Sequence, residues 1–192
     1  QEARATNVGV NILAHGGNAI DAAVAVGFTL AVTLPRAGNL GGGGFMMLHH
    51  RGSGETLALD YREMAPGLAH RDLYLDNKGN VDKDKARFSH ASVGVPGTVA
   101  GLVEAHRRYG DLSLAQVMAP AIALAENGLA VTPGLARSLA KRQKRLSKWP
   151  ASAAVFYKPD GSLYQIGDTL VQSDLAKSLR RIATTAGRDF YT

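Results

Sequence analysis

The sequence predicts an α+β protein in which helices greatly outnumber strands. Apolar periodicity gives only about two or three candidate strands among about six or seven candidate helices. One of these helices, from Asn18 to about Thr33, is apolar nearly all round, which predicts burial between other elements. So few strands cannot cover such a helix. We therefore expect the chain to form part of a larger fold.

The first half of the chain is expected to form two helices followed by two strands. A helix over Ala5–Ala14 ends at a pair of glycines, and Asn18 is the expected N-cap of the buried helix. Strands are expected at Phe45–His50 and Thr56–Tyr61. The polar segment between them contains two glycines, so the two strands are predicted to pair as a hairpin.

The second half of the chain is predominantly helical. Four helices are expected: at Thr98–Tyr109, from Ser113 onward, over the Lys- and Arg-rich stretch 137–148, and at Ser173–Thr184. Pro120 should kink the second of these, and a short hairpin is expected around 158–161. Because neither a repeat nor a low-complexity linker is present, residues 1–192 are expected to form a single unit.

Composition restricts the classes of function. The 45% hydrophobic content suffices for a core, and the longest apolar run, Ala19–Leu34, is short and contains Asp21, which argues against a transmembrane segment. Cysteine is absent, which excludes disulfides and a thiolate nucleophile. The net charge of +6 is concentrated at 137–148, where Trp149 is the only nearby aromatic residue. That pattern argues against nucleic-acid binding and favours a solvated helix face or one that meets an acidic neighbour.

Four consecutive glycines, Gly41, Gly42, Gly43 and Gly44, separate the apolar helix from the first strand. Without Cβ atoms, the backbone can adopt positive φ and other segments can approach closely. Phosphate-binding glycine loops follow a strand and precede a helix, whereas here the order is reversed. We therefore expect a close-packed turn rather than a nucleotide site.

Arg62 is the strongest candidate for a binding residue. It directly follows the second strand, and a guanidinium can hold a carboxylate through two parallel hydrogen bonds. From the residues alone, a local salt bridge from Arg62 to Asp60 or Glu63 is an equal alternative. The six histidines show no metal-ligand spacing, and position 1 is Gln rather than an N-terminal Thr, Ser or Cys nucleophile. A Ser–His–Asp triad stays open from the residues alone, but no G-x-S-x-G motif marks one. No catalytic residue is therefore assigned on this chain, and neither a metal nor a cofactor is expected.

Five blocks of sequence, in this order and spacing, resemble the large subunit of γ-glutamyltranspeptidases: GNAIDAAVAVGFTLAVT, GNLGGGGFMML, LDYREMAP, VPGTVAG and GDTLVQSDLAKSL. The resemblance runs from about Ala5 to Tyr191. It implies the N-terminal-nucleophile (Ntn) hydrolase fold, an αββα four-layer sandwich built by two subunits. This chain would supply the helix-rich first part of the large subunit.

The resemblance also implies γ-glutamyl acyl transfer and hydrolysis. A threonine at the N-terminus of the small subunit would attack the γ-amide of glutathione or another γ-glutamyl compound, and water, an amino acid or a dipeptide would then accept the acyl group. Arg62 matches the arginine that binds the α-carboxylate of the substrate, and Glu63 matches an acidic residue that would support it. The glycines at 41–44 would pack beneath the site. The family is typically periplasmic or secreted.

Two other functions remain open. A cephalosporin acylase of the same fold, which removes a glutaryl-type side chain, could share these blocks, although LDYREMAP favours the transpeptidase. Alternatively, the chain could be a non-catalytic module that binds an anionic partner through the basic helix at 137–148.

Overall fold

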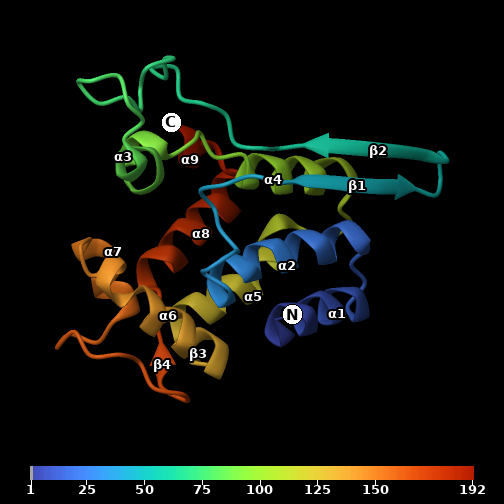
Figure 1. Cartoon of the computed structure of the whole chain (residues 1–192). Helices are drawn as coiled ribbons and strands as arrows, with labels where there is room; N and C mark the ends of the chain where they lie inside the picture. The colour runs from blue at the N-terminus through green and yellow to red at the C-terminus, as the bar shows by residue number, and fades with distance from the viewer. Residues whose placement is uncertain (1) are drawn as a thin grey trace. The chain divides into compact units, whose positions relative to one another are not determined.

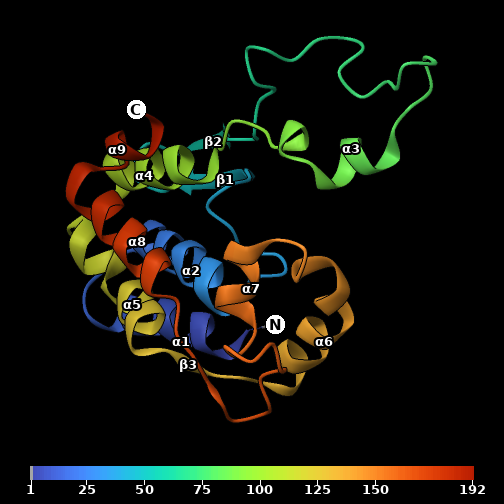
Figure 2. The same cartoon turned by 90° about the vertical axis from the view of Figure 1, so that its left-hand side faces the viewer.

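The computed structural model describes residues 2–192, which form two compact units (Figures 1 and 2). Unit 1 comprises residues 2–39 and Ala105–Thr192, and unit 2 comprises Leu40–Glu104. The boundary falls inside helix α4 (Thr98–Tyr109), which starts in unit 2 and ends in unit 1. Whether the two form the single unit expected from the sequence stays a prediction.

Unit 1 is built around a row of packed helices. Its members are α1 (Ala3–Ala14), α2 (Ala19–Thr33), α5 (Leu114–Asn127), α8 (Ser173–Thr185) and the short α9 (Arg188–Tyr191). Each helix in this row packs on the next, and α1 lies alongside α2 in Figure 1. Val24, Phe28 and Val32 of α2 are fully buried. The predicted burial of this helix is therefore confirmed.

Two predicted helix caps are confirmed. The Asn18 side chain accepts hydrogen bonds from the backbone N–H groups of Ile20 and Asp21, and the Asp21 carboxylate accepts one from the Asn18 N–H. Ser113 and Gln116 form the same reciprocal capping box at the start of α5. The α5 helix is continuous through Pro120, and the kink expected there stays a prediction.

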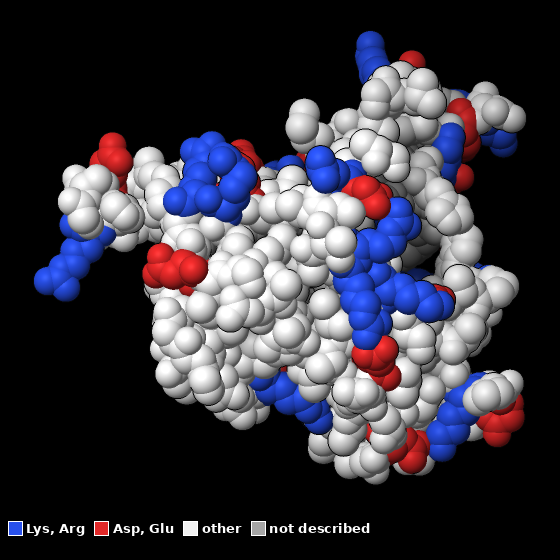
Figure 3. Space-filling view, turned by 180° about the vertical axis from the view of Figure 1, so that it is seen from behind, with Lys and Arg blue, Asp and Glu red and all other residues white. Residues whose placement is uncertain are grey.

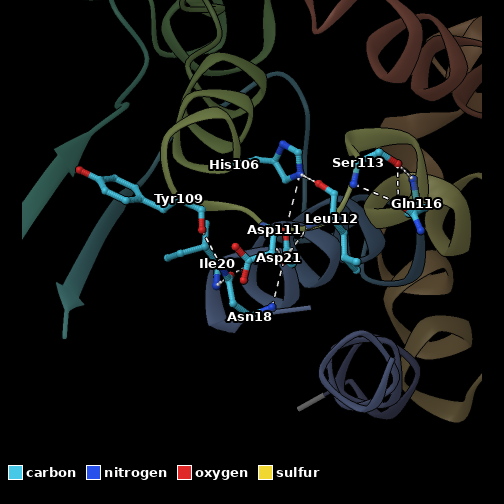
Figure 4. Close-up of polar contacts among 9 residues, drawn as sticks. All are labelled: Asn18, Ile20, Asp21, His106, Tyr109, Asp111, Leu112, Ser113 and Gln116. Atoms are coloured by element: carbon cyan, nitrogen blue, oxygen red, sulfur yellow. Dashed lines mark hydrogen bonds and ion pairs between the residues drawn. The ribbon is translucent and has the colours of Figure 1, made fainter. Parts of the chain in front are cut away.

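The Asp21 carboxylate ties the start of α2 to the turn between α4 and α5 (Figure 4). Its Oδ2 atom accepts hydrogen bonds from the N–H groups of Asp111 (3.0 Å) and Leu112 (3.3 Å), besides that of Asn18. Its Oδ1 atom lies 3.5 Å from Nε2 of His106, which in turn is 2.9 Å from the Leu112 carbonyl oxygen. Asp21 is fully buried, so its negative charge depends entirely on these partners.

The rest of unit 1 consists of two further helices and a minimal strand pair. Helix α6 (Pro133–Leu146) begins four residues before the predicted basic stretch, because the Thr132 hydroxyl caps it and Pro133 occupies its first turn. Helix α7 (Pro150–Phe156) follows. Strands β3 (Leu129–Ala130) and β4 (Thr169–Leu170) pair antiparallel.

The prediction of a hairpin around 158–161 is wrong. Residues 158–162 form a tight turn, in which the Lys158 N–H donates to the Ser162 carbonyl, but no strand flanks it. Two carboxylates explain the difference: Asp160 accepts a hydrogen bond from the Ser162 N–H, and Asp168 accepts one from the Gln165 N–H. These side chains satisfy backbone donors that a strand ladder would otherwise use.

Unit 2 contains the predicted hairpin, with strands β1 (Phe45–His50) and β2 (Glu55–Asp60). They pair antiparallel from Phe45 opposite Asp60 to His50 opposite Glu55, so the second strand starts and ends one residue earlier than predicted. A long irregular segment then leads to α3 (Lys83–Phe88), a 3₁₀ turn (His90–Ser92) and the start of α4 (Figure 2). Over residues 2–192, no helix combines the length and apolar character that a membrane crossing requires.

The Asp21 contacts predict a large effect of one substitution on stability. Asp21→Ala leaves three backbone N–H groups without their carboxylate acceptor in a buried position, so the free energy of unfolding should fall by about 3 kcal/mol. Urea unfolding measures this loss. Asp111→Ala is the matched control, because that side chain is exposed and only its backbone contacts Asp21, and it should change stability by less than about 0.5 kcal/mol. Equal effects of the two substitutions would contradict the assigned role of Asp21.

Candidate functional site

Arg62 and Glu63 lie on a short backbone segment that is held at both ends. On one side, Tyr61 exchanges two backbone hydrogen bonds with Gly44, which extends the β1–β2 ladder by one pair. On the other side, Met64 exchanges two with Val95, at 3.1 and 2.8 Å. The position of the Arg62 backbone is therefore fixed by pairing with two different segments of unit 2.

The side chains of Arg62 and Glu63 are both exposed. The Asp60 carboxylate accepts a hydrogen bond from the backbone N–H of Arg62 at 2.9 Å and does not pair with the guanidinium. Within residues 2–192, the Arg62 guanidinium has neither an ion pair nor a hydrogen bond, so the alternative of a local salt bridge to Asp60 or Glu63 is not observed. The guanidinium is thus free to bind a ligand.

Five glycines surround residues 61–63 so closely that a side chain at most of them would collide. We call them the glycine cradle: Gly43, Gly44, Gly94, Gly97 and Gly101. A Cβ atom at Gly43 would lie 2.5 Å from the Tyr61 carbonyl oxygen and 2.7 Å from the Arg62 carbonyl carbon. A Cβ at Gly97 would lie 2.7 Å from the Tyr61 carbonyl carbon. Because these are backbone atoms, they cannot rotate away.

Tyr61 fills the centre of the cradle. A Cβ atom at Gly44 would lie 2.8 Å from its Cε2 atom, and one at Gly101 would lie 2.6 Å from its Cδ1 atom. The ring is half-buried, and this burial raises the pKa of the Tyr61 phenol. The blocks LDYREMAP and VPGTVAG therefore meet at Tyr61, which places the start of α4 directly against the segment that carries Arg62.

The four consecutive glycines differ from one another in the structure. Gly43 and Gly44 belong to the cradle, and the Gly42 carbonyl accepts hydrogen bonds from the N–H groups of Gly97 (2.8 Å) and Thr98 (2.9 Å). A Cβ atom at Gly41 would meet nothing within 4 Å. The packing role expected for all four thus has a steric basis at Gly43 and Gly44, whereas Gly41 has open space.

Sequence reasoning assigned no role to Tyr61, Gly94, Gly97 or Gly101. One signal was present: Gly97 and Gly101 are four residues apart where a helix begins, so they lie on the same face and permit close approach. Which segment approaches them depends on long-range pairing, which the sequence does not display. Over the described part of the chain, no group of three or more acidic or histidine side chains could hold a metal ion.

Comparison with known proteins identifies the family. The chain matches the γ-glutamyltranspeptidase family over residues 5–192. It is 50% identical over 191 residues to the glutathione hydrolase proenzyme of Escherichia coli (strain K12), which covers 99% of this chain and 33% of the proenzyme. The structure of Helicobacter pylori γ-glutamyltranspeptidase superposes with a TM-score of 0.95 and 46% identity, covering 98% of this chain and 54% of that one.

A more distant neighbour is cephalosporin acylase from Bacillus halodurans, with a TM-score of 0.80 and 30% identity over 97% of this chain and 35% of that one. The fold is therefore that of the N-terminal-nucleophile hydrolases, and the predicted α+β class is confirmed. Within that class, the chain belongs to the γ-glutamyltranspeptidase family. It spans about a third of the length of the curated relatives it matches.

The glycine cradle predicts a position-specific effect of adding one methyl group. Gly43→Ala forces a Cβ atom against the backbone of Tyr61 and Arg62, which should cost about 1–3 kcal/mol of stability, and the larger Gly43→Val should abolish folding or maturation. Thermal unfolding and the yield of purified protein measure both effects. Gly41→Ala, two positions away in open space, should be close to neutral. Normal yield of Gly43→Val would contradict the packing role.

Proposed function

We propose that this chain supplies the substrate carboxylate site of an enzyme that transfers and hydrolyses γ-glutamyl groups. The observation that carries the proposal is the exposed, unpaired Arg62 guanidinium on a backbone clamped by the glycine cradle. A clamped backbone limits the conformational entropy that Arg62 loses when it binds. A planar guanidinium can then hold the α-carboxylate of a γ-glutamyl group through two parallel, charge-assisted hydrogen bonds.

The nucleophile in this proposal is a threonine at the N-terminus of a separate small subunit. Its hydroxyl oxygen attacks the γ-amide carbonyl carbon while its own α-amine takes the proton. The C–N bond breaks, the amine leaves with that proton, and a γ-glutamyl ester remains. Water, an amino acid or a dipeptide then attacks the ester and releases the threonine. Arg62 holds the substrate in place through both steps and takes no part in proton transfer.

Glu63 and the glycine cradle act as positioning residues in this proposal. Glu63 does not pair with the Arg62 guanidinium, but a Cβ atom at Gly94 would lie 3.0 Å from its Cγ atom, so its stem packs closely against the cradle. This contact supports a role for Glu63 in fixing the course of the backbone beside Arg62.

The exposed apolar surface of the hairpin supports the proposal that a partner chain packs on it. Phe45 and Met47 on β1 are 66% and 71% exposed, and within residues 2–192 each strand of the hairpin has only the other as a neighbour in its sheet. A two-stranded sheet is marginal by itself, and exposed apolar side chains favour burial against further polypeptide. The small subunit is the partner we propose, in a periplasmic or secreted enzyme.

A glutaryl-specific acylase is the second candidate, because cephalosporin acylase from Bacillus halodurans shares the fold. A glutaryl group differs from a γ-glutamyl group only by lacking the α-amine, and both end in the same carboxylate. Arg62 could therefore bind either acyl group and does not discriminate between them. The non-catalytic module loses support, because the chain belongs to an enzyme family.

Arg62→Ala should lower kcat/KM for a γ-glutamyl anilide by roughly 100-fold or more, mainly through KM, because it removes two charge-assisted hydrogen bonds to the substrate. Steady-state kinetics on the mature enzyme measures this loss, and gel electrophoresis should show that self-cleavage continues. Arg51→Ala, which removes an exposed arginine at the hairpin turn, is the matched control and should leave the kinetics unchanged. Unchanged kinetics for Arg62→Ala would refute the assignment.

The choice of acyl group separates the two candidate enzymes. With γ-glutamyl and glutaryl anilides that share one leaving group, the proposed transferase should prefer the γ-glutamyl compound by about tenfold or more, since only that compound offers an ammonium group to a polar site. Arg62→Ala should lower kcat/KM for both anilides by similar factors, which leaves their ratio intact. A preference for the glutaryl compound would instead identify an acylase.

A further inference from the structure

A strongly basic pocket of about 760 Å³ lies within unit 1, apart from any residue discussed above for substrate binding. Its walls come from the start of α1, the end of α2 with the residues that follow, and the first turns of α6. We call it the basic pocket because five of its lining residues are cationic: Arg4, Arg36, Arg137, Lys141 and Arg142. Among the described lining residues, Glu2 alone is acidic.

The Glu2 carboxylate already has a hydrogen-bond donor and an ion-pair partner. Glu2 caps α1 by accepting a hydrogen bond from the Ala5 N–H at 2.8 Å, and it lies 3.7 Å from the Arg4 guanidinium. Arg4 also donates to the Ala130 carbonyl oxygen at 2.7 Å, which fixes its direction. Glu2 can therefore offset part of the charge of Arg4 and leaves the other four cations uncompensated.

Three of those cations have no partner within residues 2–192. Arg36, Arg137 and Lys141 make neither a hydrogen bond nor an ion pair in the described chain. Arg137 and Lys141 lie one helical turn apart on α6, so they present two charges on one face. The first turns of α1 and α6 also line the pocket, and the positive ends of their dipoles add to its potential.

The basic side chains of α8, which also lies in unit 1, are paired with acids. On α8, Lys177 pairs with Asp174 at 2.9 Å, Arg180 pairs with Glu126, and Arg181 pairs with Asp189 at 3.4 Å. On the face of the molecule shown in Figure 3, Asp and Glu side chains lie beside several of the Lys and Arg clusters. The basic pocket differs because its cations converge on a concave surface without matching carboxylates.

We propose that the basic pocket binds a linear polyphosphate group, whether inorganic or part of a nucleotide. Closely spaced arginines and lysines need a ligand that supplies several negative oxygens in a small volume, as a chain of linked phosphates does. None of the described residues that line the pocket is aromatic, so they offer no stacking platform for a base. Recognition therefore rests on the phosphate chain. This inference does not depend on the proposed γ-glutamyl chemistry.

Titration calorimetry with sodium tripolyphosphate, on the complete protein that carries this chain, tests the proposal. Saturable binding with one site is expected, and it should weaken steeply as the salt concentration rises. The double substitution Arg137→Gln with Lys141→Gln should weaken binding by about tenfold or more, because it removes two uncompensated charges from the pocket. Arg36→Gln, from a different wall, should also weaken it. ATP should bind within about threefold of tripolyphosphate if the base is not read.

The matched control is Lys144→Gln with Lys148→Gln, which removes the same charge from the same region without touching the pocket lining. This control should change the dissociation constant by less than about twofold. Equal weakening by the two double substitutions would show general attraction to a basic surface and overturn the proposal. Absence of saturable binding would overturn it as well. A clear preference for ATP over tripolyphosphate would contradict recognition through the phosphate chain alone.

Discussion

The close approach of three backbone segments around Tyr61 is the constraint on which the candidate site depends. The loop before β1, the end of β2 and the start of α4 meet where four of the five cradle glycines leave no room for a side chain. Each glycine costs conformational entropy on folding, so the arrangement is stable only because the close contacts and hydrogen bonds that it permits offset that cost. The cradle fixes the backbone that carries the flexible, charged side chain of Arg62, because this backbone is hydrogen-bonded on both sides of the residue.

In unit 1, two segments distant in sequence are held together by a buried carboxylate rather than by the close approach of glycines. A buried carboxylate is costly unless hydrogen bonds replace its hydration, and Asp21 receives three backbone N–H groups from two segments about ninety positions apart. Gly110 contributes here too, because a Cβ atom at that position would lie 2.7 Å from Asp21 Oδ1. The start of α2 and the turn before α5 are thereby held together by contacts that only this combination of an acid and a glycine allows.

Local features of the sequence were sufficient to predict those elements whose structure depends on contacts between near neighbours in the chain. Asn18 and Ser113 identified helix starts because capping is a contact between near neighbours, and the hairpin followed from a glycine-containing turn segment between two short strands. Prediction failed at 158–161, where carboxylates three or fewer residues from their backbone donors replaced a strand ladder. It also could not find the cradle, because the partners of Gly97 and Gly101 lie about forty residues away in the sequence. Arg62 was proposed from its position after a strand together with the family resemblance, and the structure adds that its guanidinium does not pair with Asp60.

Arg62 and the cations of the basic pocket suit different ligands. Arg62 is a single guanidinium on a fixed backbone, an arrangement that selects one carboxylate by geometry and suits a substrate that must be oriented for attack. In the basic pocket, cations from three segments converge, and much of their attraction comes from summed charge. The first arrangement should tolerate salt but not the exchange of Arg for Lys, since Lys cannot form two parallel bonds. The second should tolerate that exchange but lose affinity as salt rises, because screening acts on total charge. The effects of salt and of Arg-to-Lys substitution on ligand affinity therefore distinguish a site that orients one carboxylate from a site that attracts its ligand through summed charge.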